Sequence, residues 1–130
     1  MKRKGSTCDF VEERNAELLK AYRRNFMRPD LKSLMEVYEA AANSEAPRFY
    51  VSECRAVIVY RYWKKYGRLP VAVGSRRKMF HLIAERADSI LAANPDCTDR
   101  DAVANVIYSP APTFFLSPLS VKTIIHKLRS

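Results

Sequence analysis

The side chains that could carry out catalysis stand apart from one another in this sequence. His81 and His126 are the two histidines, and neither belongs to a metal-ligand motif with a cysteine or a carboxylate. The three glycines are isolated, so no Gly-rich phosphate loop is present. We therefore expect a protein that is not an enzyme, that has no cofactor and that has no small-molecule substrate.

The cysteines and the one acidic cluster also have structural explanations. An odd number of widely spaced cysteines is typical of a reducing compartment and argues against a disulfide framework or a zinc site. They are Cys8, Cys54 and Cys97. Asp96, Asp99 and Asp101 resemble metal ligands, but negative charge is also favoured at a helix N-terminus. We interpret this cluster as helix capping and expect no metal.

The positive charge is distributed unevenly along the 130 residues. The chain has 23 Lys and Arg against 14 Asp and Glu, a net charge of +9. Residues 1–66 have a net charge of +5, residues 67–78 of +4, and residues 79–130 of zero. A concentrated positive field is typical of a protein that binds a polyanion, most often nucleic acid.

Basic and aromatic side chains alternate in the positive region, as they do in nucleic-acid-binding surfaces. The candidate nucleic-acid-binding residues are Arg48, Ser52, Arg55, Arg61, Tyr62, Lys65, Arg76, Arg77 and Lys78. Basic residues also complement the dipole at helix C-termini, which explains Arg23, Arg24 and Lys64 without any ligand.

An internal repeat organises the elements that carry these side chains. The segment APRFYVS at residues 46–52 recurs as APTFFLS at residues 111–117, and we call the alignment of position 46 with position 111, continued along the chain, the repeat register. The apolar positions that follow residue 52 at i, i+3, i+4 and i+7 spacing are apolar again after residue 117. The capping-box pair Ser33 and Glu36 is matched by Thr98 and Asp101. We interpret the sequence as an internal duplication.

The pattern predicts an all-α protein of two tandem three-helix units. The expected helices span residues 11–27, 33–43 and 52–66 in the first unit, and residues 77–92, 98–108 and 117–129 in the second. Within each unit an Ala-Pro-aromatic corner precedes the third helix, because proline excludes the α conformation from the residue before it.

The predicted division is a basic first unit at 1–66, a basic linker at 67–78 and a charge-neutral second unit at 79–130. The linker contains the β-prone run VAV and allows a brief strand. Units of this size are marginally stable alone, so we expect one shared core. Phe49 and Trp63 are expected to be buried in it.

The stretch LKSLMEVYEAAANSEAPRFYVSECRAVIVYRYWK resembles the helix-turn-helix class of DNA-binding domains in outline. The loop between its second and third helices is longer than the three or four residues of the standard turn. The resemblance implies that Ser52, Glu53 and Arg55 face bases, and that Arg48 and Lys65 contact phosphates.

These observations favour a small, basic, non-catalytic protein that binds nucleic acid, most simply duplex DNA. Its size and composition suggest a transcription regulator or an accessory protein of a phage or mobile element. The alternative is a structural or adaptor protein whose basic face binds an acidic protein partner or packs in a homo-oligomer or larger assembly. RNA is a third candidate target. The chain has no apolar run long enough to cross a membrane, and its N-terminus lacks a signal-peptide pattern, so we expect a cytoplasmic protein without a membrane partner.

Overall fold

The computed structural model describes residues 10–129, and the regular secondary structure of this part of the chain is entirely α-helical. Its helices are α1 (Val11–Phe26), α2 (Leu34–Ala42), α3 (Glu53–Tyr66), α4 (Ser75–Ala93), α5 (Asp99–Ile107) and α6 (Pro118–Arg129). The all-α prediction is confirmed, and no strand forms within the described residues. The linker region therefore contains no strand: residues 67–74 form an irregular loop with bends, and α4 already begins at Ser75. Predictions for Cys8 and the other residues before Phe10 lie outside the described part.

The helix boundaries follow from capping side chains. Ser33, Ser52 and Thr98 each accept a hydrogen bond from the backbone N–H three residues later, at 3.1 to 3.2 Å. Pro118 opens α6, where its missing N–H is not needed. Gly67 ends α3 in the left-handed conformation, with φ of 73°, and its N–H donates to the carbonyl of Trp63. A residue with a side chain would be strained at Gly67.

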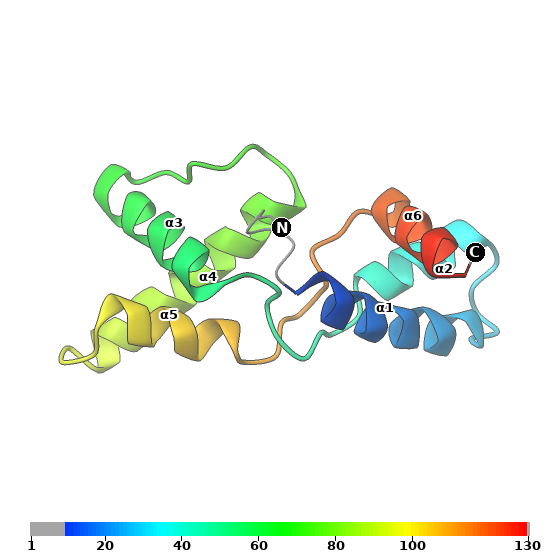
Figure 1. Ribbon diagram of the computed structural model, residues 1–130, viewed down its shortest axis with the longest axis horizontal. Coiled ribbons are helices and arrows are strands. Elements are labelled where there is room, and N and C mark those ends of the chain that lie inside the picture. The colour runs from blue at the N-terminus through cyan, green and yellow to red at the C-terminus, as the bar shows by residue number, and fades with distance from the viewer. Residues whose placement is uncertain (1–9, 130) are drawn as a thin grey trace.

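The third helix of each predicted unit packs in the other half of the molecule. Helices α1, α2 and α6 form one lobe, and helices α3, α4 and α5 form the other (Figure 1). The chain therefore crosses between the lobes after α2 and again after α5. The packing groups the helices differently from the predicted units at 1–66 and 79–130. Those units therefore remain a prediction about the repeat in the sequence.

The two crossing segments are hydrogen-bonded to each other. The backbone N–H of Ala46 donates to the carbonyl of Ala111 and the reverse bond is also made, both at 2.9 Å. Two further bonds flank this bridge, from Phe49 N to the Ile107 carbonyl at 3.0 Å and from Phe114 N to the Ala42 carbonyl at 2.9 Å. The repeat register maps each of these contacts onto another one. The crossover therefore lies on an approximate two-fold axis.

Aromatic side chains fill the crossover. Phe49 stacks on Phe115, with ring centroids 5.8 Å apart, and Tyr50 stacks on Phe114 at 6.3 Å. Phe49 is 1% exposed, so its predicted burial is confirmed. Trp63, by contrast, is only partly buried and packs on Tyr60 at the margin of the core, because it lies in the last turns of α3. The buried residues form one cluster that includes both lobes.

Candidate nucleic-acid interface

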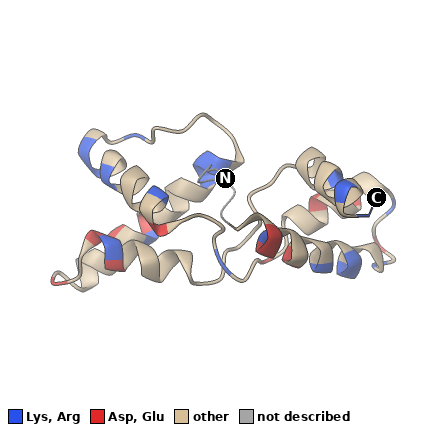
Figure 2. Cartoon of the chain, viewed as in Figure 1, with Lys and Arg blue, Asp and Glu red and all other residues tan. Residues whose placement is uncertain are grey.

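A continuous basic stretch begins near the start of α3 and extends into α4. Residues 54–84 contain eight Lys and Arg and no Asp or Glu. Figure 2 shows this charge on α3, in the loop that follows it and at the start of α4. We call the surface formed by α3, residues 67–74 and the first turn of α4 the basic face.

The solvent-facing side of α3 carries three of the predicted residues. Arg61, Tyr62 and Lys65 lie on one stripe of the helix together with Ile58, while the opposite side packs on α4 and α5. Ile58 is 56% exposed. The amphipathic period of α3 explains this arrangement, because the buried positions lie on one side of the helix and leave the basic ones in water.

Part of the charge on α3 is paired with the N-terminus of α5. The Asp99 carboxylate lies 3.4 Å from Nε of Arg61 and 3.2 Å from Nζ of Lys64. Such exposed pairs contribute little to stability. Asp99 and Asp101 lie in the first turn of α5, where Thr98 accepts a hydrogen bond from the Asp101 N–H, in agreement with the predicted capping role.

The first turn of α4 has an unusual charge. Arg76, Arg77 and Lys78 lie there, with no acidic residue in the turn and no side-chain cap. A helix N-terminus carries a partial positive charge and its first N–H groups have no intrahelical partner, so three cations at this position are unfavourable in the free protein. A bound anion would relieve this repulsion and would accept hydrogen bonds from the free N–H groups.

Two predicted arginines from different helices approach each other where α3 and α4 begin. Burial, followed by the charge of Arg55, lowers the pKa of Arg76. Nε of Arg55 is buried and has no hydrogen-bond partner among the described residues. Neither guanidinium has a carboxylate partner within residues 10–129. The fold thus places two like charges together without a counterion from that part of the chain.

Two other predicted residues have structural roles. Ser52 caps α3 through its hydroxyl. Arg48 donates from Nε to the carbonyl of Phe49 at 2.9 Å and from Nη2 to that of Val51 at 3.0 Å. Glu53, which the helix-turn-helix resemblance placed against bases, instead accepts a hydrogen bond from the Tyr108 hydroxyl at 2.7 Å.

The predicted residues therefore do not all face one way. Lys78 opens onto a separate hollow that it shares with Glu39 and Ser117, on the side of α4 next to the other lobe. Arg76 also lines a cavity at the crossover. Five of the predicted basic residues lie on α3 or in the first turn of α4 without an ion pair to a carboxylate among residues 10–129: Arg55, Lys65, Arg76, Arg77 and Lys78.

Sequence reasoning missed two basic residues next to these sites. Arg68 donates to the Tyr62 hydroxyl at 3.4 Å, and the basic linker was a signal that could have included it. Arg14 lines the crossover cavity with Arg48 and Arg76. Nothing in its sequence context, which contains the acidic residues Glu12 and Glu13, pointed to this position.

Searches against protein-family models, curated proteins and solved structures each found no match to this chain. Within residues 10–129, no group of three or more His, Cys, Asp or Glu side chains is arranged to hold a metal ion. None of the helices described is both long enough and apolar enough to cross a membrane.

Proposed function

We propose that the protein is a small, non-catalytic, cytoplasmic nucleic-acid-binding protein whose basic face contacts the phosphate backbone of duplex DNA. The observation that carries this proposal is the first turn of α4, where Arg76, Arg77 and Lys78 oppose the helix dipole and the turn itself contains no acidic residue. Such an arrangement costs stability in the free protein, and a bound polyanion compensates for it.

The recurrence of APRFYVS as APTFFLS supports a duplicated three-helix unit as the origin of the fold. In this proposal α4, α5 and α3 act together as a helix-turn-helix-like lobe, with α3 supplied across the crossover. The exposed stripe of α3 then approaches the groove, and the start of α4 holds a phosphate. A role in regulating transcription, or as an accessory protein of a phage or mobile element, fits the size and charge of the chain.

Duplex binding is expected to weaken steeply with salt. If four to six phosphates are contacted, the logarithm of the association constant falls against the logarithm of the salt concentration with a slope of about −4 to −5. Fluorescence anisotropy with a labelled duplex at several salt concentrations measures this slope. We expect the combined variant Arg76→Gln, Arg77→Gln and Lys78→Gln to flatten the slope by about 2 to 3.

A matched control removes the same charge from the other lobe. Arg23, Arg24 and Lys122 are exposed on α1 and α6, away from the basic face. Changing these three to glutamine should leave the slope nearly unchanged. Equal losses from both triple variants would show that only net charge matters and would contradict the proposed face. Parallel titrations with RNA and single-stranded DNA identify the preferred nucleic acid.

Ile58 supports the adaptor alternative, because an exposed apolar side chain within a basic surface suits an acidic and partly apolar protein partner. In that case no duplex binds at moderate salt, and Ile58→Asp abolishes capture of the acidic partner.

A further inference from the structure

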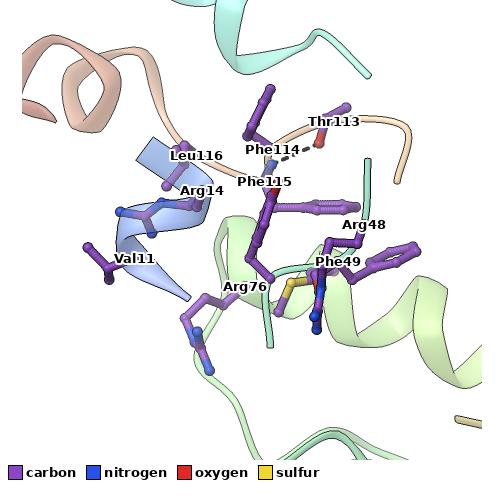
Figure 3. A pocket seen from close by; sticks show the side chains of 11 residues that line it. Val11, Arg14, Arg48, Phe49, Arg76, Thr113, Phe114, Phe115 and Leu116 are labelled. Atoms are coloured by element: carbon purple, nitrogen blue, oxygen red, sulfur yellow. Dashed lines mark hydrogen bonds between the residues drawn. The ribbon is translucent and has the colours of Figure 1, made fainter. Parts of the chain in front are cut away.

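A cavity of about 260 Å³ lies at the crossover between the lobes. Its wall includes all four rings of the two stacked pairs, those of Phe49 with Phe115 and of Tyr50 with Phe114. Figure 3 shows that the arginines lining the cavity come from separate elements: Arg14 from α1, Arg48 from the first crossing segment and Arg76 from α4. Among the described residues, no carboxylate lines the cavity.

The cavity lies on the approximate two-fold axis, but its charge does not follow that symmetry. The repeat register maps nearly every lining residue onto another one. The counterparts of Arg14, Arg48 and Arg76 are Met79, Thr113 and Val11, in that order. None of the three arginines thus has a basic counterpart across the axis, and a symmetric core would not require them.

The lining also contains donors that the described part of the chain does not use. The Tyr50 hydroxyl is buried and has no hydrogen-bond partner among the described residues. Burial, with a smaller contribution from Glu17 and Glu13, raises the pKa of Tyr50 to about 12, so the hydroxyl keeps its proton. Arg76 makes no hydrogen bond or ion pair with the described residues, and its guanidinium lies 5.2 Å from the centroid of the Phe80 ring. An unpaired buried donor is costly unless a ligand or water satisfies it.

We propose that this cavity binds a nucleotide, with its phosphate held by Arg76 and the Tyr50 hydroxyl and its base against the aromatic wall. Arginine recognises phosphate by paired N–H donors and also stacks on planar rings. The volume is slightly below the range of typical ligand pockets, which limits the ligand to about one nucleotide. Arg48 is fixed by two backbone carbonyls and contributes its charge without moving.

A free mononucleotide and one unpaired nucleotide of a nucleic-acid strand both present a phosphate and a base to the cavity. Arg76 also belongs to the basic face, but the inference does not rest on duplex binding, because the Tyr50 hydroxyl and the aromatic rings of the cavity lie outside that face. If duplex DNA fails to bind, the titrations described next are unaffected.

Isothermal titration calorimetry with adenosine 5′-monophosphate, adenosine and inorganic phosphate tests the site. We expect the monophosphate to bind at least about tenfold more tightly than either part alone. Tyr50→Phe and Arg76→Gln should each weaken it about tenfold, which is the loss expected for one hydrogen bond to a charged group. Arg24→Gln makes the same charge change on the exposed surface of α1, outside both the cavity and the basic face, and should weaken binding less than about threefold.

The melting temperature separates a binding effect from a folding effect. Because the Tyr50 hydroxyl has no partner among the described residues of the free protein, Tyr50→Phe should not lower the melting temperature. A short single-stranded oligonucleotide that loses affinity on Tyr50→Phe, while the monophosphate does not bind, would identify a strand as the source of the nucleotide. The proposal is overturned if neither probe binds, or if binding is the same in the wild type, Tyr50→Phe and Arg76→Gln.

Discussion

Phe49 and Tyr50 are neighbours in the sequence with different roles at the crossover. Phe49 is fully buried, stacks on Phe115 and has its ring centroid 5.6 Å from the Arg86 guanidinium. Tyr50 stacks on Phe114, but its hydroxyl has no partner among the described residues. At this scale the sequence predicted the burial of Phe49 correctly from the repeat register, but it also predicted a buried Trp63, which is only partly buried. It contained no sign of the unpaired hydroxyl, since hydrogen-bond partners depend on tertiary packing.

Phe49→Ala should destabilise the protein by about 3–5 kcal/mol, because it removes a large ring from a closed core. Chemical denaturation followed by circular dichroism measures the loss. Tyr66→Ala serves as the control, because Tyr66 is 52% exposed and should cost far less. A melting curve of Phe49→Ala that matches the wild type would show that the corner does not hold the two lobes together.

Tyr60, which is buried, and Tyr50, whose hydroxyl is buried, predict a loss of stability at alkaline pH. Burial raises the pKa of Tyr50 to about 12, and burial together with the hydrogen bond to Asp88 at 2.6 Å also raises the pKa of Tyr60 above its ordinary value. The unfolded chain ionises near pH 10, while the folded protein keeps both protons. The stability is therefore complete below pH 10 and falls as the pH rises toward the folded pKa values.

Urea denaturation between pH 9 and 12 measures this fall. Tyr50→Phe and Tyr60→Phe should each reduce its steepness, and the exposed Tyr66→Phe is the matched control. If neither Tyr50→Phe nor Tyr60→Phe changed the pH dependence, the raised pKa values of the two tyrosines would be contradicted.

At the scale of elements, the sequence predicted all six described helices within two residues of their observed ends. The agreement has a local cause, since Ser33, Ser52 and Thr98 cap their helices within one turn of sequence. Helix α4 departs most from expectation because it begins after Gly74 without a capping side chain. The unfavourable charge of its first turn is the feature that links this element to the proposed function.

Arg77→Glu should raise the free energy of unfolding by about 0.5–1 kcal/mol, because an acidic residue suits the N-terminal turn of α4. The same substitution should weaken duplex binding. Arg24→Glu is the control and should lower the free energy of unfolding, because Arg24 lies in the last turn of α1, where a positive charge is favourable. Thermal denaturation and anisotropy on both variants test the pair. A destabilising Arg77→Glu would show that the turn has no excess of positive charge.

At the scale of the whole molecule, the exchange of third helices was beyond sequence reasoning. The apolar period of α3 showed which face is buried, but Ala56, Val59 and Tyr60 pack equally well against any matching helix. The repeat made this exchange harder to predict, because α3 and α6 are similar enough to occupy equivalent positions in the two lobes. The sequence predicted the basic face only as a net positive charge. It did not predict that Asp99 on α5 forms an ion pair with Arg61 on α3.

A cut in the loop at residues 67–74 should leave the two pieces of the chain associated. Each piece contributes one helix to the lobe of the other, so native packing holds them together. Limited proteolysis followed by size-exclusion chromatography should give one peak in native buffer and two fragments in denaturant. Pieces that separate in native buffer would contradict the exchanged arrangement.

The crossover also governs the order in which the chain folds during synthesis on a ribosome. Helices α1 and α2 emerge first, but the helix that completes their lobe begins only at Pro118. Helix α3 likewise waits for α4 and α5. The lobe that starts the described chain is therefore the last to close, and until then its apolar surface stays open to chaperones and proteases. A nascent chain that stalls before α6 is left with an incomplete first lobe, so quality control can distinguish it from the finished protein.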